Sequence, residues 1–250
     1  MLVRSIISLA LFLALLAAAP AGADSYSANG RQNVDEVSYP WSALGRVNNE
    51  YGGFCTGTLI GLRTVLTAAH CLRNKRRGGW LRPASLHFVA GYQRGDFLAH
   101  ARVSSYVIGG DAESRNGTSA TPSSDWAILT LERDLGALVG TLEVSPAPAG
   151  SELMQAGYRF DRPHVLSADE SCKVVGPVAN GSLVAHGCAA THGDSGSPLL
   201  WRRGDDYRVG AMHVAILGGK NPFGLAIPAR ALGRALNLLK REQYANWPLP

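Results

Sequence analysis

The feature of this sequence that most limits its fold is the shortness of its apolar runs. Segments such as Thr56–Ile60, Leu86–Ala90 and Val209–Ile216 end at or near Gly, Pro, Asn or Asp. The chain holds 29 Gly and 13 Pro among 250 residues. Short runs bounded by turn-forming residues are typical of β-strands, because helices need longer periodic segments. The sequence therefore predicts an all-β domain.

Only the C-terminal tail has the spacing of a helix. Four apolar residues recur there at positions i, i+3, i+4 and i+7: Leu232, Ala235, Leu236 and Leu239. This spacing predicts a C-terminal α-helix over about residues 228–241, with Pro228 in its first turn. We expect this helix to pack against the β body.

Composition and charge exclude several classes of function. The chain is 46% apolar and 17% charged, and 24 basic residues against 19 acidic ones give a net charge of +5. The basic residues are dispersed, and the one dense run, Arg73–Arg77, is interpreted as a solvated loop. No basic helix or basic stripe interleaved with aromatic residues is present, so we expect no nucleic-acid partner.

The N-terminus has the pattern of an export signal. Arg4 precedes the apolar run Ile6–Ala19, and the small residues Ala21 and Ala23 follow it. The run has 14 residues, fewer than the roughly 20 that a membrane-spanning helix needs. We therefore predict a signal peptide at residues 1–23, cleaved after Ala23, and a secreted or periplasmic protein with no membrane partner; an uncleaved anchor is the alternative.

The four cysteines fall into two pairs of equal spacing. Cys55 and Cys71 lie 16 positions apart, and so do Cys172 and Cys188. Export favours disulfide bonds, and of the three possible connectivities the sequence favours pairing neighbours without settling it. A zinc site would need closely spaced pairs of the C-x2-C type, which are missing. We expect no metal and no cofactor.

Three segments carry residues suited to catalysis, each in an informative local setting. His70 ends an apolar strand and precedes a cysteine in Thr67–Cys71 (TAAHC), whereas Asp125 opens an apolar run in SDWAIL. Ser195 stands between glycines in THGDSGSP. Taken singly, these residues also fit a core histidine, a strand-end cap and a tight hairpin.

Together the three side chains match the chemistry of nucleophilic catalysis. A hydroxyl is a poor nucleophile until an imidazole accepts its proton, and a carboxylate can orient that imidazole and stabilise its charged form. Two other acids compete with Asp125 for this role. Asp111 lies in a Gly-rich loop and Asp134 in a polar turn, so neither is set into an apolar run.

These segments make the chain resemble the chymotrypsin-like (trypsin-fold) serine proteases. It is more narrowly similar to the exported bacterial branch that includes the V8-like glutamyl endopeptidases, with its short chain, few cysteines and a GAMH strand after the serine. The resemblance implies a protease domain at residues 39–250, made of two six-stranded antiparallel β-barrels packed together, with their boundary near residues 145–150. It further implies a monomer that cleaves polypeptides.

The resemblance also implies a role for each site residue. Ser195 attacks the scissile carbonyl, His70 acts as general base and then as general acid, and Asp125 orients His70. The backbone N–H groups of Gly193 and Ser195 would form the oxyanion hole. The implied activity is that of a serine endopeptidase.

By the same resemblance, the substrate-binding pocket is lined by Ala189, Ala190, Thr191, His192, His213 and Gly224. Enzymes that cleave after Lys or Arg carry an acid where this chain has Ala189. His213 matches the histidine that binds the substrate carboxylate in glutamyl endopeptidases, which favours an acidic P1 residue. Ala190 departs from the threonine of the V8-like enzymes.

Activation of the enzyme is a separate question. Asp194 resembles the acid that pairs with a newly freed N-terminal amine in many zymogens of this family. Arg31–Val34 (RQNV) offers a cut site, although the family's Ile-Val-Gly-Gly start is missing. Residues 24–38 are therefore interpreted as an N-terminal segment or a short propeptide.

Two other functions stay open at this point. A protease fold can act as a non-catalytic binding module, or as an esterase-type hydrolase, because fold does not prove function. Labelling by a fluorophosphonate would separate an active hydrolase from a binding module.

Overall fold

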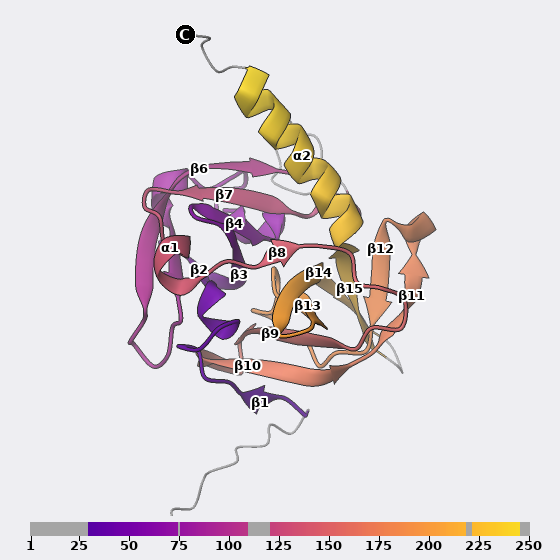
Figure 1. Cartoon of the computed structure of the whole chain (residues 1–250). Helices are drawn as coiled ribbons and strands as arrows, with labels where there is room; N and C mark the ends of the chain where they lie inside the picture. Colours follow the sequence, from indigo (N-terminus) through magenta and orange to yellow (C-terminus); the bar gives the residue numbers. More distant parts are fainter. Residues whose placement is uncertain (1–29, 75, 110–120, 219–221, 246–250) are drawn as a thin grey trace, which may run out of the picture.

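The computed structural model describes residues 30–74, 76–109, 121–218 and 222–245. The predicted signal peptide at residues 1–23 and the competing acid Asp111 lie outside this range. Within it the chain forms two β-sheets and a C-terminal helix (Figure 1). The prediction of a mostly β fold is confirmed.

The first sheet is a closed antiparallel barrel with the strand order β2-β3-β4-β7-β6-β5. Its strands are β2 (Leu44–Asn49), β3 (Phe54–Gly61), β4 (Thr64–Thr67), β5 (Leu86–Ala90), β6 (Ala99–Ile108) and β7 (Ala127–Leu131). The fully buried ring of Phe88 fills part of the interior. A Cβ atom at Gly45 would collide with this ring, and one at Gly57 would collide with Val47 and Val65 and lie 3.2 Å from the ring. Glycines at these positions therefore let the barrel close around the ring.

The second sheet follows the order β1-β10-β9-β13-β14-β15-β12-β11, and β8 pairs with β14 in parallel. Its strands are β1 (Gln32–Asn33), β8 (Glu143–Val144), β9 (Leu153–Arg159), β10 (Arg162–Cys172), β11 (Val174–Val178), β12 (Leu183–His186), β13 (Pro198–Arg203), β14 (Asp206–Leu217) and β15 (Phe223–Pro228). Six central strands correspond to the expected second barrel, and β1, β8 and β11 are additions to it.

The ends of this central path are joined to one another. Cys172 closes β10 and is disulfide-bonded to Cys188, which follows β12. The N–H of Gly187 donates to the carbonyl of Lys173 at 2.9 Å beside this disulfide. The sheet is therefore curled rather than flat, as a barrel requires.

The helices are few and mostly short in the described chain. The C-terminal helix α2 covers Ala229–Ala245, whereas α1 covers Gly136–Val139. Five 3-10 turns complete the elements: η1 (Trp41–Ala43), η2 (Ala69–Leu72), η3 (Pro83–Ser85), η4 (Pro122–Ser124) and η5 (Ala179–Gly181). No helix among the described residues is long and apolar enough to span a membrane.

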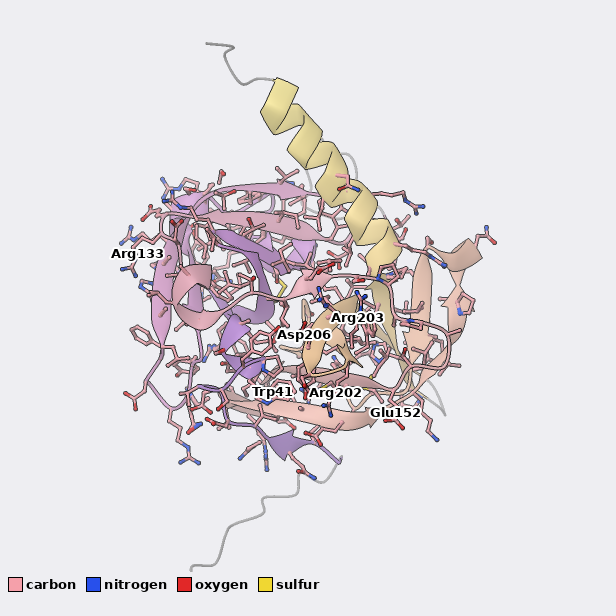
Figure 2. All side chains as sticks on the ribbon, viewed as in Figure 1. Trp41, Arg133, Glu152, Arg202, Arg203 and Asp206 are labelled. Carbon is pink, nitrogen blue, oxygen red and sulfur yellow. A yellow bond between two sulfur atoms is a disulfide. The ribbon has the colours of Figure 1, made fainter. Side chains whose placement is uncertain are left out.

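The C-terminal helix is anchored at its start. It begins one residue later than the sequence predicts, because Pro228 is the last residue of β15. Leu232 on its first turns is 1% exposed, and the helix then extends away from the β body (Figure 1). Charged side chains such as those of Arg133 and Glu152 lie on the outside of the molecule (Figure 2).

Candidate active site

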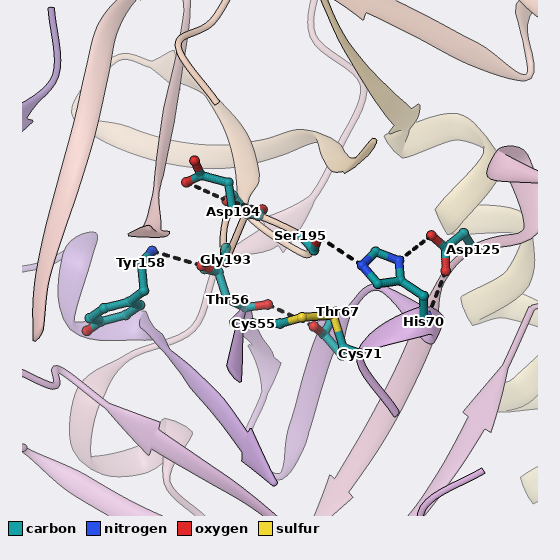
Figure 3. The surroundings of a disulfide bond; sticks show 11 residues. Cys55, Thr56, Thr67, His70, Cys71, Asp125, Tyr158, Gly193, Asp194 and Ser195 are labelled. Atoms are coloured by element: carbon teal, nitrogen blue, oxygen red, sulfur yellow. Dashed lines mark hydrogen bonds and ion pairs between the residues drawn. A yellow bond between two sulfur atoms is a disulfide. The ribbon is translucent and has the colours of Figure 1, made fainter. Parts of the chain in front are cut away.

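Three side chains from separate parts of the chain form a continuous hydrogen-bonded line (Figure 3). The Nδ1 atom of His70 lies 2.6 Å from Oδ2 of Asp125, and its Nε2 atom lies 2.9 Å from Oγ of Ser195. Oδ1 of Asp125 accepts the backbone N–H of His70 at 2.8 Å. Because the carboxylate only accepts, Nδ1 carries the proton and Nε2 faces the serine hydroxyl as an acceptor.

Burial differs along this line in a way that suits its chemistry. Asp125 is 6% exposed, whereas the side chain of His70 is 37% exposed. A carboxylate removed from water interacts more strongly with a nearby imidazolium than a solvated one does. The arrangement can therefore stabilise a positive charge that forms on His70.

The position of His70 is set by the end of β4. The histidine lies in η2, and the next residue, Cys71, is disulfide-bonded to Cys55 of β3. The hydroxyl of Thr67 donates to the carbonyl of Thr56 at 2.8 Å across the same two strands. The segment that carries the imidazole is thus fixed to the barrel by a covalent bond and a hydrogen bond.

Asp125 follows the short turn η4, which is capped by Thr121, and lies two residues before the start of β7. Its N–H donates to the carbonyl of Pro122, so the turn directs the acid inward. Of the competing acids, Asp134 forms an exposed ion pair with Arg63 instead. Of Asp125 and Asp134, the two candidate acids within the described residues, only Asp125 contacts the imidazole.

The turn that carries Ser195 requires glycine on both sides. Gly193 has a φ of +94° and Gly196 a φ of +83°, values that residues with a Cβ atom rarely adopt. A Cβ atom at Gly193 would meet the carbonyl of Tyr158, and one at Gly196 would meet the carbonyl of Thr56. The sequence pattern GDSG therefore reflects both backbone conformation and close packing.

The N–H groups of Gly193 and Ser195 are oriented by the peptide planes to which they belong. The carbonyl of His192 accepts the N–H of Phe160, in the β9–β10 turn, at 2.7 Å. The carbonyl of Asp194 accepts the N–H of Ser197 at 2.8 Å. A trans peptide points its N–H opposite to its carbonyl. Within the described chain neither N–H has an acceptor, so both can serve an anionic oxygen.

Asp194, next to the serine, is fully buried and paired. Its Oδ1 atom lies 3.2 Å from Nη1 of Arg31, and its Oδ2 atom accepts the N–H of Thr191 at 2.9 Å. Burial raises the pKa of Asp194, and the positive charge of Arg31 is the largest influence that lowers it again. The sequence indicated Arg31 only as a cut site, since nothing in its local pattern marks a buried ion pair.

The expected pocket residues before the serine differ in their exposure. Ala189, Ala190 and Thr191 are half-buried, whereas His192 is exposed. The N–H of Ala189 donates to Oδ2 of Asp169 at 2.8 Å.

Gly224, expected in the pocket wall, packs directly against a buried histidine. A Cβ atom there would collide with the imidazole of His186, so this glycine makes room for a histidine that sequence reasoning missed. His186 ends β12 in an ordinary alternating run, which carries no signal of its contacts.

His186 and His213 form a buried pair of imidazoles. Nε2 of His186 lies 3.0 Å from Nδ1 of His213, and the N–H of Cys188 donates to Nδ1 of His186 at 3.3 Å. This order assigns the protons: His186 donates through Nε2, and His213 keeps its own proton on Nε2. Burial lowers the pKa of His186 to about 4 and that of His213 well below its usual value.

A cavity of about 460 Å³ opens beside the nucleophile. Ser195 and His70 border it, and it continues along the Cys55–Cys71 disulfide to Arg73. Of the expected pocket residues only His192 is among its described walls, so this cavity is separate from the one assigned to substrate selection.

Cys55, His70 and Cys71 form a group of potential metal ligands in the described chain. The ligand atoms of Cys55, His70 and Cys71 lie within 4.8 Å of one another. Both sulfur atoms are already joined in a disulfide, whereas a metal binds the free thiolate. This group therefore does not fit a metal site while the disulfide is intact.

Comparisons with known proteins agree with this architecture. The family model described as Trypsin matches residues 28–231. Serine protease SP24D from Anopheles gambiae is 31% identical over 200 residues, which span 69% of this chain and 67% of that protein.

Two solved structures share the fold at low sequence identity. A Glu endopeptidase in complex with MPD has a TM-score of 0.71 at 20% identity, covering 85% of this chain and 97% of its own. Protease Anisep from Arthrobacter nicotinovorans has a TM-score of 0.62 at 19% identity, covering 79% and 93% respectively.

The buried histidine pair predicts how stability depends on pH. Because the folded-state pKa of His186 is about 4 against 6.5 for an unperturbed histidine, the unfolded chain binds more protons between these values. The free energy of unfolding should therefore fall as the pH drops from 6.5 towards 4. Urea titrations across this range should show a shallower slope for His186→Gln, by up to about 1.4 kcal/mol per pH unit.

The matched control is His164→Gln, because His164 is exposed. That variant should keep the slope of the unaltered protein. Equal slopes for His186→Gln and the unaltered protein would contradict the assignment of a neutral pair.

Proposed function

Because this chain belongs to the trypsin family of serine proteases, we propose that it is an exported endopeptidase that cleaves polypeptides through an acyl-enzyme on Ser195. Membership of the family makes the chain a serine endopeptidase. The residue roles, the export and the substrate preference are the proposal. The observation that carries it is the line from Asp125 through His70 to Ser195, with both contacts of the imidazole at hydrogen-bond distance.

The first half of the reaction follows from this geometry. Oγ of Ser195 attacks the scissile carbonyl while Nε2 of His70 takes its proton, and Asp125 stabilises the resulting imidazolium. The developing oxyanion is stabilised by the N–H groups of Gly193 and Ser195. His70 then gives its proton to the leaving amine, and the acyl group stays on the serine.

The second half repeats these steps with water as the nucleophile. His70 takes a proton from the water molecule, which attacks the acyl-enzyme, and returns it to Ser195. Removing one oxyanion donor from such a site slows turnover by about 10²–10³-fold. The rate of turnover therefore depends strongly on how rigidly the GDSG turn holds these two N–H groups.

An acidic P1 residue is the proposed substrate preference. The proton assignment leaves Nε2–H of His213 as a donor without a partner among the described residues. This N–H can donate a hydrogen bond to a substrate carboxylate. The fold similarity to a Glu endopeptidase points the same way. Ala189 offers no carboxylate to select Lys or Arg, whereas Ala190 supplies no hydroxyl to share the binding of an acid.

Export is supported by the two disulfides, which form and persist in oxidising compartments. We keep the signal peptide at residues 1–23, the protease domain at residues 39–250 and the monomeric state as parts of the proposal. A binding module is disfavoured because all three side chains are present and in contact. An esterase would use the same acyl chemistry, so only substrates separate the two.

Replacement of the nucleophile gives the most direct test of the class. A fluorophosphonate should label the purified oxidised protein once per chain, and Ser195→Ala should abolish both labelling and peptide hydrolysis. Ser197→Ala is not a suitable control, because its hydroxyl bonds Asp194. Ser104→Ala, at an exposed position in the middle of β6, should label normally. Absence of labelling in the unaltered protein would favour a binding module.

The P1 preference can be measured with peptides that differ at one residue. We expect kcat/KM for Glu to exceed that for Gln, Ala, Phe and Arg by at least about tenfold, equivalent to about 1.4 kcal/mol. His213→Ala should reduce this ratio while fluorophosphonate labelling persists. A protein that cleaves without preferring Glu would overturn the substrate proposal and leave the protease assignment intact.

A further inference from the structure

Resting on the proposed function, we propose that Arg31 is a positioning residue of the oxyanion hole. Its guanidinium holds the Asp194 carboxylate in place, and Asp194 in turn fixes the peptides of Gly193 and Ser195. The segment before the first barrel is then part of the active enzyme. No cleavage after Arg31 is needed to form the site.

The contact between Arg31 and Asp194 leaves neither side chain exposed to solvent. Arg31 and Asp194 are each fully buried, and their side chains form an ion pair at 3.2 Å. The remaining guanidinium N–H groups donate to Oγ of Ser167 at 3.2 Å and to its carbonyl at 2.5 Å. Burial of an arginine is tolerated only where its donors find acceptors, and here they do.

Arg31 contacts the serine loop at two points. Besides Asp194, Nη1 donates to the carbonyl of Ala189 at 2.9 Å. Asp194 also accepts the N–H of Thr191. One side chain therefore connects the segment before the serine to the residue adjacent to it.

Arg31 directly precedes strand β1, whose pairing fixes the position of its side chain. Gln32 pairs with Ala168 and Asn33 with Ser167 in the β1–β10 ladder. The N–H of Val34 continues this pairing to the carbonyl of Leu166 at 3.2 Å. Backbone pairing on one side of Arg31 thus holds its side chain at a fixed depth in the second sheet.

Loss of the guanidinium has a definite electrostatic consequence. A buried carboxylate without its cation must become protonated, admit water or move towards solvent. Any movement of Asp194 displaces the adjacent N–H of Ser195, which the oxyanion requires. A cut after Arg31 would release this side chain from the chain that carries the serine, so it would remove a contact rather than create one.

The test combines substitutions at Arg31 with a matched control. Arg31→Ala should lower kcat by about 10²–10³-fold, with a smaller change in KM, because the oxyanion forms only in the transition state. Arg31→Lys should recover part of the loss, since it keeps a charge but not the planar set of donors. Arg162→Ala is the control, because Arg162 bonds the side chain of Asn33 in the same segment.

Two measurements on the unaltered enzyme do not depend on whether Arg31→Ala folds well, and a third tests rescue of that variant. Mass spectrometry of the fluorophosphonate-labelled active enzyme should find Arg31 within the mature chain, and acetylation of the N-terminal amine should not change activity. Adding guanidinium at millimolar concentration to Arg31→Ala should restore activity, whereas sodium should not.

The outcomes separate this inference from the proposed function. An inactive unaltered protein would overturn both. An active protein in which Arg31→Ala keeps kcat within about threefold, or whose labelled form begins after Arg31, would overturn the inference alone.

A different observation carries a second inference, which also rests on the proposed function. We infer that the cavity beside His70 binds the part of the substrate that leaves first, and that it favours acidic side chains there. His70 donates its proton to the leaving amine, so the chain beyond the scissile bond lies on the His70 side. That is the side on which the cavity opens.

The charges around this cavity are one-sided. Arg73 and Arg76 line it, and no carboxylate is among its described lining residues. Nε of Arg73 is buried without a hydrogen-bond partner among the described residues. The positive charge of the Arg73 guanidinium at the cavity wall would attract a substrate carboxylate. The guanidinium of Arg76 lies 5.7 Å from the ring of Tyr51, which also lines the cavity.

Peptides that share one sequence before the scissile bond test this inference. With Glu at the second or third position after that bond, kcat/KM should exceed that for Gln by about threefold to tenfold, and the excess should fall as salt rises. Arg73→Gln/Arg76→Gln should bring the ratio close to one. Arg82→Gln, an exposed arginine outside the cavity, should not.

A Gln peptide that is cleaved as fast as the Glu peptide by the unaltered enzyme would contradict the cavity assignment. Cleavage of neither peptide would count against the proposed protease activity instead.

Discussion

A nucleophile carried by one sheet and a base carried by another can react only if the two sheets are held in register. Thr56 of β3 provides that register. Its N–H donates to the carbonyl of Ser195 at 3.0 Å, its hydroxyl donates to the carbonyl of Gly193 at 3.0 Å, and that hydroxyl accepts the N–H of Tyr158 at 2.9 Å. Figure 3 shows this residue between the serine turn and the disulfide that fixes His70.

The site also depends on how charge is distributed among buried groups. Asp125 is buried next to a half-exposed imidazole, so a charge that appears on His70 has a prepared partner. Asp194 is neutralised by Arg31, whereas His186 and His213 stay uncharged because burial lowers both pKa values. The nucleophile and the proposed substrate pocket thus share one second-sheet core, in which Asp194 is paired with Arg31 and the two imidazoles are neutral.

Much of the site was predictable because its signals are local. A histidine directly after an apolar strand, an acid at the start of one and a serine between glycines each have a reason within a few residues of sequence. The contacts of Arg31 and His186 were not predictable, because their partners Asp194 and His213 are brought close only by sheet pairing. Strand β1 was missed for the same reason: it is the polar pair Gln32–Asn33, whose strand conformation comes from its partner β10.

The proposed mechanism requires that Ser195 becomes acylated during turnover. Enzyme mixed with a slowly hydrolysed activated ester and then quenched in acid would be digested and analysed by mass spectrometry. We expect one acyl group per chain, located on the peptide that contains Ser195, and we expect it to disappear as hydrolysis is completed. Turnover without any acylated peptide, or with the acyl group on another residue, would contradict an acyl-enzyme on Ser195.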